Sequence, residues 1–114
     1  MIQDYQRITQ IKYKRNYHSK KYKKWRKDVY TRDGYQCQWP NCPNNSKTKR
    51  LNAHHIKPWM NNPALRYVVS NGITLCSMHH ALIHSRSAKS YEDLCFRLID
   101  KCLRNTINGF ADDR

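Results

Sequence analysis

Apolar residues follow one another at three- and four-residue steps near the start of the chain and predict an amphipathic helix. Tyr22, Trp25 and Val29 occupy one face of this segment, and the opposite face is nearly all lysine. Ser19 is a suitable N-cap, and the helix is expected to end near Tyr30, shortly before an Arg-Asp-Gly run.

A second amphipathic helix is predicted toward the C-terminus. Ser90 and Asp93 have the spacing of a capping box in its acidic variant. The apolar stripe that follows consists of Leu94, Cys95, Leu98, Ile99 and Cys102. Such a stripe is typical of core packing rather than of a binding face.

Between the two helices, the polar and apolar positions predict a knuckle, two short strands and a third helix. Residues 35–45 contain Cys-x4-Cys with prolines and asparagines, which favours a knuckle. Residues 51–56 predict a strand, and residues 73–76 predict a second strand or a tight turn behind the strong turn signal Asn71-Gly72. A helix is expected over residues 77–85.

The composition fits one small domain that needs help from a metal. The chain has 114 residues, of which 39% are hydrophobic, and its mean hydropathy is −0.99. A chain of this size has a thin core, so a bound metal would add stability. We expect residues 1–32 to be a basic arm and helix, residues 33–86 the core, and residues 87–114 a helix packed on that core.

Cysteine usage and hydropathy predict a cytoplasmic protein. The five cysteines are an odd number, and three of them lie near histidines in the centre, which suits metal ligands better than a disulfide framework. Cys95 and Cys102 are expected in the core. No apolar run approaches the roughly 20 residues that a membrane span needs, and the first residues lack a signal pattern. We therefore expect no membrane partner.

The charge predicts a polyanionic partner. The formal net charge is +14, the pI is about 9.9, and lysines and arginines concentrate between residues 12 and 32. Tyrosines and a tryptophan interleave this run, which favours nucleic acid over an idle solvated face, the usual meaning of a charge run. The residues expected to bind DNA are Lys20, Lys21, Lys23, Lys24, Arg26 and Lys27.

Four histidines of the central segment form a pattern that can hold a metal ion. His80 and His84 are four residues apart, so a helix puts them on one face, about 40° apart around its axis. His54, at the strand end, can complete a set of three nitrogens with open positions, as in catalytic sites. His55 points to the other side of the strand, and the ordinary histidine pKa of about 6.5 suits a general base. Asn71 is expected either to brace the loop that carries His55 or to serve as an added ligand.

A second ligand set is predicted around the cysteines. Cys37 and Cys42 on the knuckle, together with Cys76 and His79, make a Cys3His set of the kind that a closed structural zinc site prefers. His79 and His80 are about 100° apart on a helix, so each can serve a different metal. A two-Cys two-His finger fits less well, because adjacent histidines stand where that motif requires His-x3-5-His.

These motifs resemble the HNH family of nucleases. The matching text is His-His-Ile-x-Pro at residues 54–58, Asn-Gly-Ile-Thr-Leu-Cys at residues 71–76, and the histidines at 80 and 84. The resemblance covers roughly residues 33–84. It implies a ββα-metal fold with His54, His80 and His84 on a catalytic divalent ion (Mg²⁺, Mn²⁺, Ni²⁺ or Zn²⁺), His55 as the base and Asn71 as the middle residue of the family name.

The resemblance also implies a substrate and a setting. Similar small proteins occur in phages and restriction systems and cleave DNA, so packaging or restriction machinery is a candidate partner in a bacterial or infected cell. One position departs from the family, whose second zinc pair is usually Cys-x2-Cys, because His79 stands in the place of the last cysteine. The zinc site is therefore either Cys3His, which we favour, or a weaker one.

Taken together, the sequence predicts a small α+β protein. It would have a ββα-metal (His-Me finger) core with a zinc knuckle, flanked by a basic N-terminal helix and a C-terminal amphipathic helix. The predicted function is metal-dependent hydrolysis of DNA phosphodiester bonds, by nicking or double-strand cleavage, with low intrinsic sequence specificity and one structural Zn²⁺. The alternative is a non-catalytic, zinc-stabilised module that binds nucleic acid. A secreted toxin domain has no support in the sequence.

Overall fold

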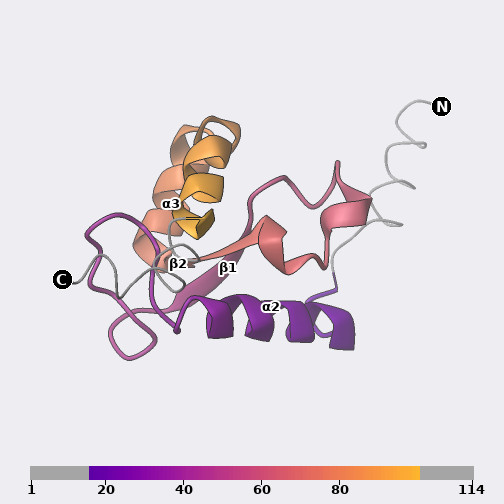
Figure 1. Cartoon of the computed structure of the whole chain (residues 1–114), viewed down its shortest axis with the longest axis horizontal. Helices are drawn as coiled ribbons and strands as arrows, with labels where there is room; N and C mark the ends of the chain where they lie inside the picture. Colours follow the sequence, from indigo (N-terminus) through magenta and orange to yellow (C-terminus); the bar gives the residue numbers. More distant parts are fainter. Residues whose placement is uncertain (1–15, 101–114) are drawn as a thin grey trace.

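A computed structural model of the chain describes residues 16–100 (Figure 1). Most of the predicted N-terminal arm, together with Cys102 and the end of the last predicted helix, lies outside the described residues. The described part contains three α-helices, three short 3-10 helices and a two-stranded sheet. Within residues 16–100, no helix has the length and apolar character that crossing a membrane requires.

Helix α2 (Lys20–Arg32) is the predicted basic helix. Ser19 caps its start, since the Ser19 side chain accepts a hydrogen bond of 3.1 Å from the Tyr22 backbone N–H. The apolar stripe of Tyr22, Trp25 and Val29 is buried, as its spacing predicted. The helix ends two residues later than expected, at Arg32.

Strands β1 (Leu51–His55) and β2 (Gly72–Cys76) pair in antiparallel register, with Leu51 opposite Cys76 and His55 opposite Gly72. The connection between them is long and contains two 3-10 helices, η1 (Pro63–Leu65) and η2 (Val69–Asn71).

The prediction of a turn at Asn71-Gly72 is wrong. Asn71 ends η2, and Gly72 is already extended, with φ −127° and ψ 150°. A turn signal reflects residues that tolerate unusual backbone angles, but this glycine is needed for a different reason, namely close approach of a neighbouring side chain.

Helix α3 (Ser77–Arg86) follows β2 directly, so the order β1, β2, α3 gives the predicted ββα arrangement. The small α+β fold class is thereby confirmed. A 3-10 turn, η3 (Lys89–Tyr91), leads into a further helix over residues 92–100.

The predicted capping box of this last helix is wrong. Helical backbone angles are already present at Ala88, and the Ser90 backbone N–H lies 3.4 Å from the Ser87 hydroxyl. The Ser87 hydroxyl therefore accepts a hydrogen bond from a backbone N–H of η3, and the extended backbone of Ser87 also ends α3. Two candidate cap serines three residues apart are difficult to distinguish from sequence, because both satisfy the local pattern.

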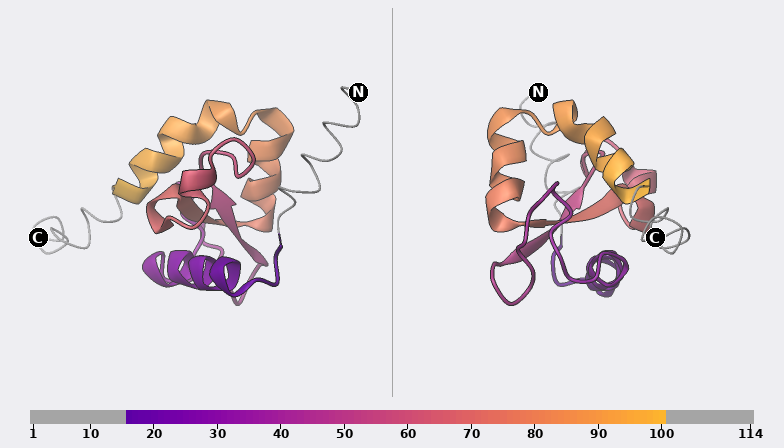
Figure 2. Two further views of the ribbon diagram at one scale, coloured as in Figure 1. Left: turned by 90° about the vertical axis from the view of Figure 1, so that its right-hand side faces the viewer. Right: turned by 60° about the vertical axis from the view of Figure 1, so that its left-hand side comes forward.

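The two faces of the sheet carry different elements (Figures 1 and 2). Helix α2 covers one face, where Tyr22, Trp25, Val29 and Ala53 form a small apolar cluster. Helix α3 and residues 92–100 cover the other face. The larger core there contains Cys37, Cys42, Ile56, Ile73, Leu75, Cys76, Ile83, Cys95 and Ile99. Side chains alternate along a strand, so consecutive residues of β1 face different helices.

Candidate active site

Three histidines converge between β1 and α3. His54 on the strand and His80 and His84 on the helix have ring nitrogens that all lie within 4.8 Å of one another. The Nε2 atoms of His80 and His84 are 3.1 Å apart. His54 is buried, His80 is half-buried and His84 is exposed, so the cluster is open on one side. We call these three residues the histidine cluster.

The donor chemistry of the histidine cluster suits a divalent ion. Imidazole nitrogens bind first-row transition metals, and three protein ligands with an open side are the usual pattern of a catalytic rather than a structural site. Helical spacing accounts for His80 and His84, and antiparallel pairing of β1 with β2 holds His54 above the start of α3.

His55, the next residue, faces α2 instead. Its Nε2 lies 2.9 Å from the backbone carbonyl oxygen of Arg66. A carbonyl oxygen only accepts hydrogen bonds, so Nε2 carries the hydrogen of the neutral ring and Nδ1 has the lone pair. The His55 ring also stacks on the indole of Trp25, with centroids 3.9 Å apart and planes 8° apart. Neither metal-ligand group of the described residues includes His55.

The side chain of Asn71 holds the long connection in place. Its Oδ1 accepts a hydrogen bond of 2.9 Å from the Lys57 backbone N–H, and its Nδ2 donates to the carbonyl oxygens of Lys57 (3.2 Å) and Leu65 (3.3 Å). Asn71 is buried, and both polar atoms of its amide are engaged by backbone. Of the two roles predicted for Asn71, this geometry favours the brace.

A second cluster joins the knuckle to α3. Cys37, Cys42, Cys76 and His79 each offer one ligand atom, all within 4.8 Å of one another. The Sγ atoms of Cys42 and Cys76 are 4.0 Å apart, and His79 Nδ1 lies 3.2 Å from Cys76 Sγ and 3.7 Å from Cys37 Sγ. We call these four residues the Cys3His cluster.

This spacing fits a zinc ion. Tetrahedral zinc with Zn–S bonds of about 2.3 Å holds two sulfur ligands about 3.8 Å apart, close to the separation found between Cys42 and Cys76. Thiolate and imidazole are the donors that structural zinc prefers. All three cysteines are buried, and the His79 ring stacks on Trp39 with centroids 4.9 Å apart. The Cys3His cluster can therefore hold a structural metal.

The thiols of the cluster differ in acidity. Burial raises the pKa of Cys37 to about 12. Burial also opposes ionisation of Cys76, but hydrogen bonds from the His79 backbone, the Asn44 side chain and Cys37 outweigh it and lower the pKa of Cys76. The surroundings of Cys76 thus stabilise a thiolate better than those of Cys37 do.

A groove of about 660 Å³ opens beside the histidine cluster. His54, His55, His80 and His84 line it together with residues of α2, of β1 and of the segment that follows β1. Of the six basic residues predicted to bind DNA, Arg26 lines this groove.

Two of the other basic residues point elsewhere. Lys24 pairs with Asp28 at 2.9 Å, and Lys21 lies over the Tyr67 ring at 5.9 Å. Arg50, which was not among the predicted residues, also lines the groove.

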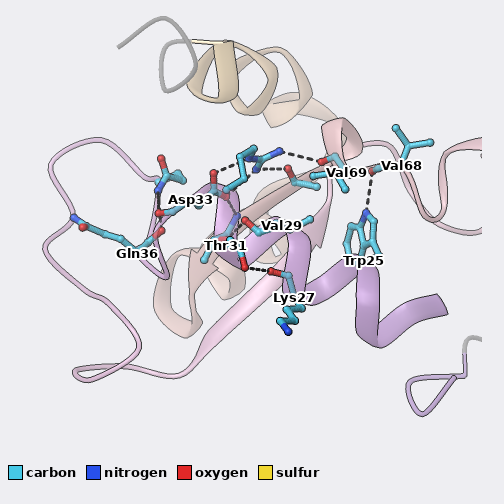
Figure 3. Close-up of polar contacts among 12 residues, drawn as sticks. Trp25, Lys27, Val29, Thr31, Asp33, Gln36, Val68 and Val69 are labelled. Carbon is cyan, nitrogen blue, oxygen red and sulfur yellow. Dashed lines mark hydrogen bonds and ion pairs between the residues drawn. The ribbon is translucent and has the colours of Figure 1, made fainter. Parts of the chain in front are cut away.

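Sequence reasoning missed the contacts that tie α2 to the end of the long connection and to the start of β2 (Figure 3). Trp25 Nε1 donates a hydrogen bond of 2.9 Å to the carbonyl oxygen of Val68. Arg32 donates to the carbonyl oxygens of Val69 (2.9 Å) and Gly72 (2.7 Å) and pairs with Asp33 at 2.8 Å.

The Asp33 carboxylate also accepts a hydrogen bond of 2.8 Å from the Thr74 backbone N–H. The Arg-Asp-Gly run indicated only a helix end, and no local pattern predicts partners some 40 residues away.

The comparisons with known proteins agree with this geometry. A family model described as "HNH endonuclease" matches residues 28–87, more than half of the chain, and this segment contains both clusters and His55. Searches of the curated proteins and of the solved structures found no match. With the family model spanning the ββα unit and both ligand clusters, the chain belongs to the HNH endonuclease family.

Proposed function

We propose that this protein is a metal-dependent endonuclease that hydrolyses phosphodiester bonds of DNA, with His55 as the general base. One observation carries the proposal. His55 adjoins the histidine cluster in sequence and lines the same groove, yet it stands apart from the cluster, and its Nε2 is held by a carbonyl oxygen. That arrangement leaves Nδ1 as the basic nitrogen of the neutral ring.

The hydrolytic step follows from these positions. His55 accepts a proton at Nδ1 from a water molecule whose oxygen forms the new bond to phosphorus. The bond from phosphorus to the leaving sugar oxygen breaks, and that oxygen takes up a proton from solvent. A divalent ion held by His54, His80 and His84 would neutralise charge on the phosphate and on the leaving oxygen.

The Cys3His cluster has a supporting role in this proposal. A zinc ion bound there would tie the knuckle to the first turn of α3, the helix that carries His80 and His84. Metal-binding energy of this kind contributes directly to folding. Asn71 would act indirectly, because it fixes the connection that carries Arg66, and the Arg66 carbonyl oxygen orients His55.

DNA is the substrate that the charge and the groove support. The net charge of +14 attracts a polyanion over long range. Arg26 and Arg50 lie on the groove and would contact phosphates near the cut, whereas lysines farther along α2 would contribute to binding without reading bases. Phosphate contacts carry no sequence information, so we expect low intrinsic sequence specificity.

Plasmid cleavage tests the proposal. Supercoiled plasmid incubated with the protein and Mg²⁺ or Mn²⁺ should give nicked or linear forms, and EDTA should prevent this. His55→Ala should lower the rate by about 10²–10⁴-fold, the usual contribution of a general base. His18→Ala is the matched control, because His18 is exposed and is not among the groove-lining residues, and its rate should be unchanged.

The outcomes separate an enzyme from a binding module. Retained cleavage in His55→Ala would contradict the role of His55. Intact plasmid under all divalent ions tried, with tight DNA binding preserved, would overturn the proposal and favour a non-catalytic zinc module.

A further inference from the structure

The stacked pair formed by Trp25 and His55 connects α2 to the base of the proposed reaction. The two rings lie parallel, with centroids 3.9 Å apart, and their exposed fractions are only 2% and 6%. Trp25 precedes the segment that matches the family model, which begins at residue 28. The indole of this pair therefore comes from the part of α2 that precedes the matched segment, whereas the imidazole lies within that segment.

We infer that Trp25 is a positioning residue for His55, holding the imidazole in the plane that keeps Nδ1 directed for proton transfer. The inference rests on the proposed function, because it assigns a partner to the proposed base. It also makes α2 part of the catalytic unit, in addition to the DNA-binding role predicted for its lysines.

Both rings are anchored to the same short stretch of the long connection. His55 Nε2 donates to the carbonyl oxygen of Arg66. Trp25 Nε1 donates to the carbonyl oxygen of Val68 at 2.9 Å (Figure 3). The hydrogen bond of His55 fixes the ring within its plane, and the indole face blocks tilting out of that plane. Together the two contacts leave the imidazole little rotational freedom.

Gly72 explains why the indole reaches this position. A Cβ placed on Gly72 would lie 2.7 Å from Trp25 Cζ2 and 2.6 Å from Val29 Cγ2, closer than real contacts allow. Gly72 pairs with His55 across the sheet. The indole therefore packs on the bare backbone of β2 directly beside the strand residue that it stacks on, which only glycine permits.

A purely structural role is the competing explanation, because Trp25 also belongs to the apolar cluster with Tyr22, Val29 and Ala53. A core residue affects activity only through the folded fraction. A positioning residue lowers the rate of the folded enzyme, since a misplacement of about 1 Å at a reacting group costs about 100-fold. Val29 is fully buried in the same cluster and stands as the matched core control.

The test compares three variants in single-turnover plasmid nicking at saturating protein and at a temperature where each is folded by circular dichroism. Trp25→Leu should lower the rate constant about 10- to 100-fold, with the half-saturating protein concentration changed less than about 3-fold. Trp25→Phe keeps an aromatic face and should recover most of the rate. Val29→Ala should lower the melting temperature but leave the rate constant unchanged.

Two further measurements keep the inference open to refutation. In a His55→Ala background, Trp25→Leu should produce no additional loss, because it acts through His55. Independently of activity, ¹⁵N NMR of the histidine rings should show His55 with the hydrogen on Nε2 in the native protein and in Trp25→Phe, and a mixture of tautomers in Trp25→Leu.

Several results would overturn the inference: an unchanged rate in Trp25→Leu, an equal loss in Val29→Ala, an additive loss in the His55→Ala background, or the same ring signals in Trp25→Leu as in the native protein. A native protein that never cuts plasmid would defeat the proposed function alone. The NMR comparison would then still decide whether Trp25 orients the ring.

Discussion

The two ligand clusters share one short helix but are built in opposite ways. In the Cys3His cluster the three sulfur donors are buried, and His79 is covered by Trp39. In the histidine cluster His84 is exposed, and the three rings line an open groove. Neighbouring residues, His79 and His80, belong to different clusters. A closed set of donors serves a permanent metal, whereas an open set leaves room for substrate.

The dependence between the clusters is expected to run in one direction. Cys76 is both the last residue of β2 and the N-cap position of α3, so a metal at the Cys3His cluster would fix the point from which the helix starts. The positions of His80 and His84 then follow from helical geometry. Losing the closed cluster should disrupt the open one, but losing the open cluster should leave the closed one intact.

The largest effect should come from Cys76→Ser. Zinc binding contributes about 10–16 kcal/mol in zinc-finger peptides, which matches or exceeds the 5–15 kcal/mol total stability of a typical domain. We therefore expect loss of bound zinc, of cooperative thermal unfolding and of cleavage, measured by elemental analysis, calorimetry and plasmid nicking.

Cys95→Ala is the matched control for this variant. Cys95 is also buried, and burial raises its pKa to about 11, so it remains a neutral thiol outside both clusters. Its replacement should retain zinc. A Cys76→Ser protein that keeps both its zinc and its melting temperature would refute the role given to the closed cluster.

His84→Ala should affect the histidine cluster and leave the Cys3His cluster intact. His84 is exposed, so its removal should leave stability within about 0.5 kcal/mol. Removing a residue that only hydrogen-bonds to a metal ligand lowers metal affinity about 10- to 100-fold. Removing a ligand itself should therefore weaken divalent-ion binding by at least about 100-fold. Calorimetric titration with Mn²⁺ and plasmid nicking measure the two effects, and unaltered nicking would show that the histidine cluster holds no catalytic ion.

Asn71→Asp examines the connection that joins the two strands. The carboxylate keeps an acceptor for the Lys57 N–H but faces the carbonyl oxygens of Lys57 and Leu65, to which the amide donates. A buried polar group without partners costs about 1–3 kcal/mol. We expect a loss of this size in chemical unfolding, together with slower cleavage.

Asn61→Asp makes the same chemical change on an exposed position of the same connection and should be neutral. Equal stability of the two variants would remove the bracing role from Asn71.

The smallest effect should appear in the basic helix, where Arg26 and Lys24 lie on different sides. Arg26 lines the groove, and Lys24 pairs with Asp28. Removing one phosphate contact should lower the slope of log affinity against log salt by about 1, so Arg26→Ala should show this change. Lys24→Ala should alter the slope less in the same fluorescence titration. Indistinguishable variants would mean that the groove is not the path of the DNA.

Most of the predictions made from the sequence depend on the spacing of residues that are close together in the chain. The cap and apolar stripe of α2, the convergence of His80 with His84, and the donors of the Cys3His cluster all depend on residues close together or on one recurring motif. Such patterns follow from 3.6 residues per helical turn and from the ligand preferences of metals. The roles assigned to these residues remain predictions until they are measured.

The contacts that orient the site could not be predicted in this way. The stack of Trp25 on His55, the bonds from Arg32 to Val69 and Gly72, and the brace from Asn71 to Lys57 all depend on the path of the long connection. The same dependence explains why the turn predicted at Asn71-Gly72 is not formed. Asn71 makes hydrogen bonds to a distant segment and Gly72 allows close packing by α2, and neither contact can be predicted from a local sequence pattern.

The central claim is that His55 stays off the metal so that it can take a proton from water. A crystal structure of the protein soaked with Mn²⁺, with anomalous maps collected above the Zn and Mn absorption edges, tests this most directly. We expect zinc between Cys37, Cys42, Cys76 and His79, manganese between His54, His80 and His84, and His55 Nδ1 uncoordinated. Manganese bound by His55, or no ion among the three histidines, would contradict the account.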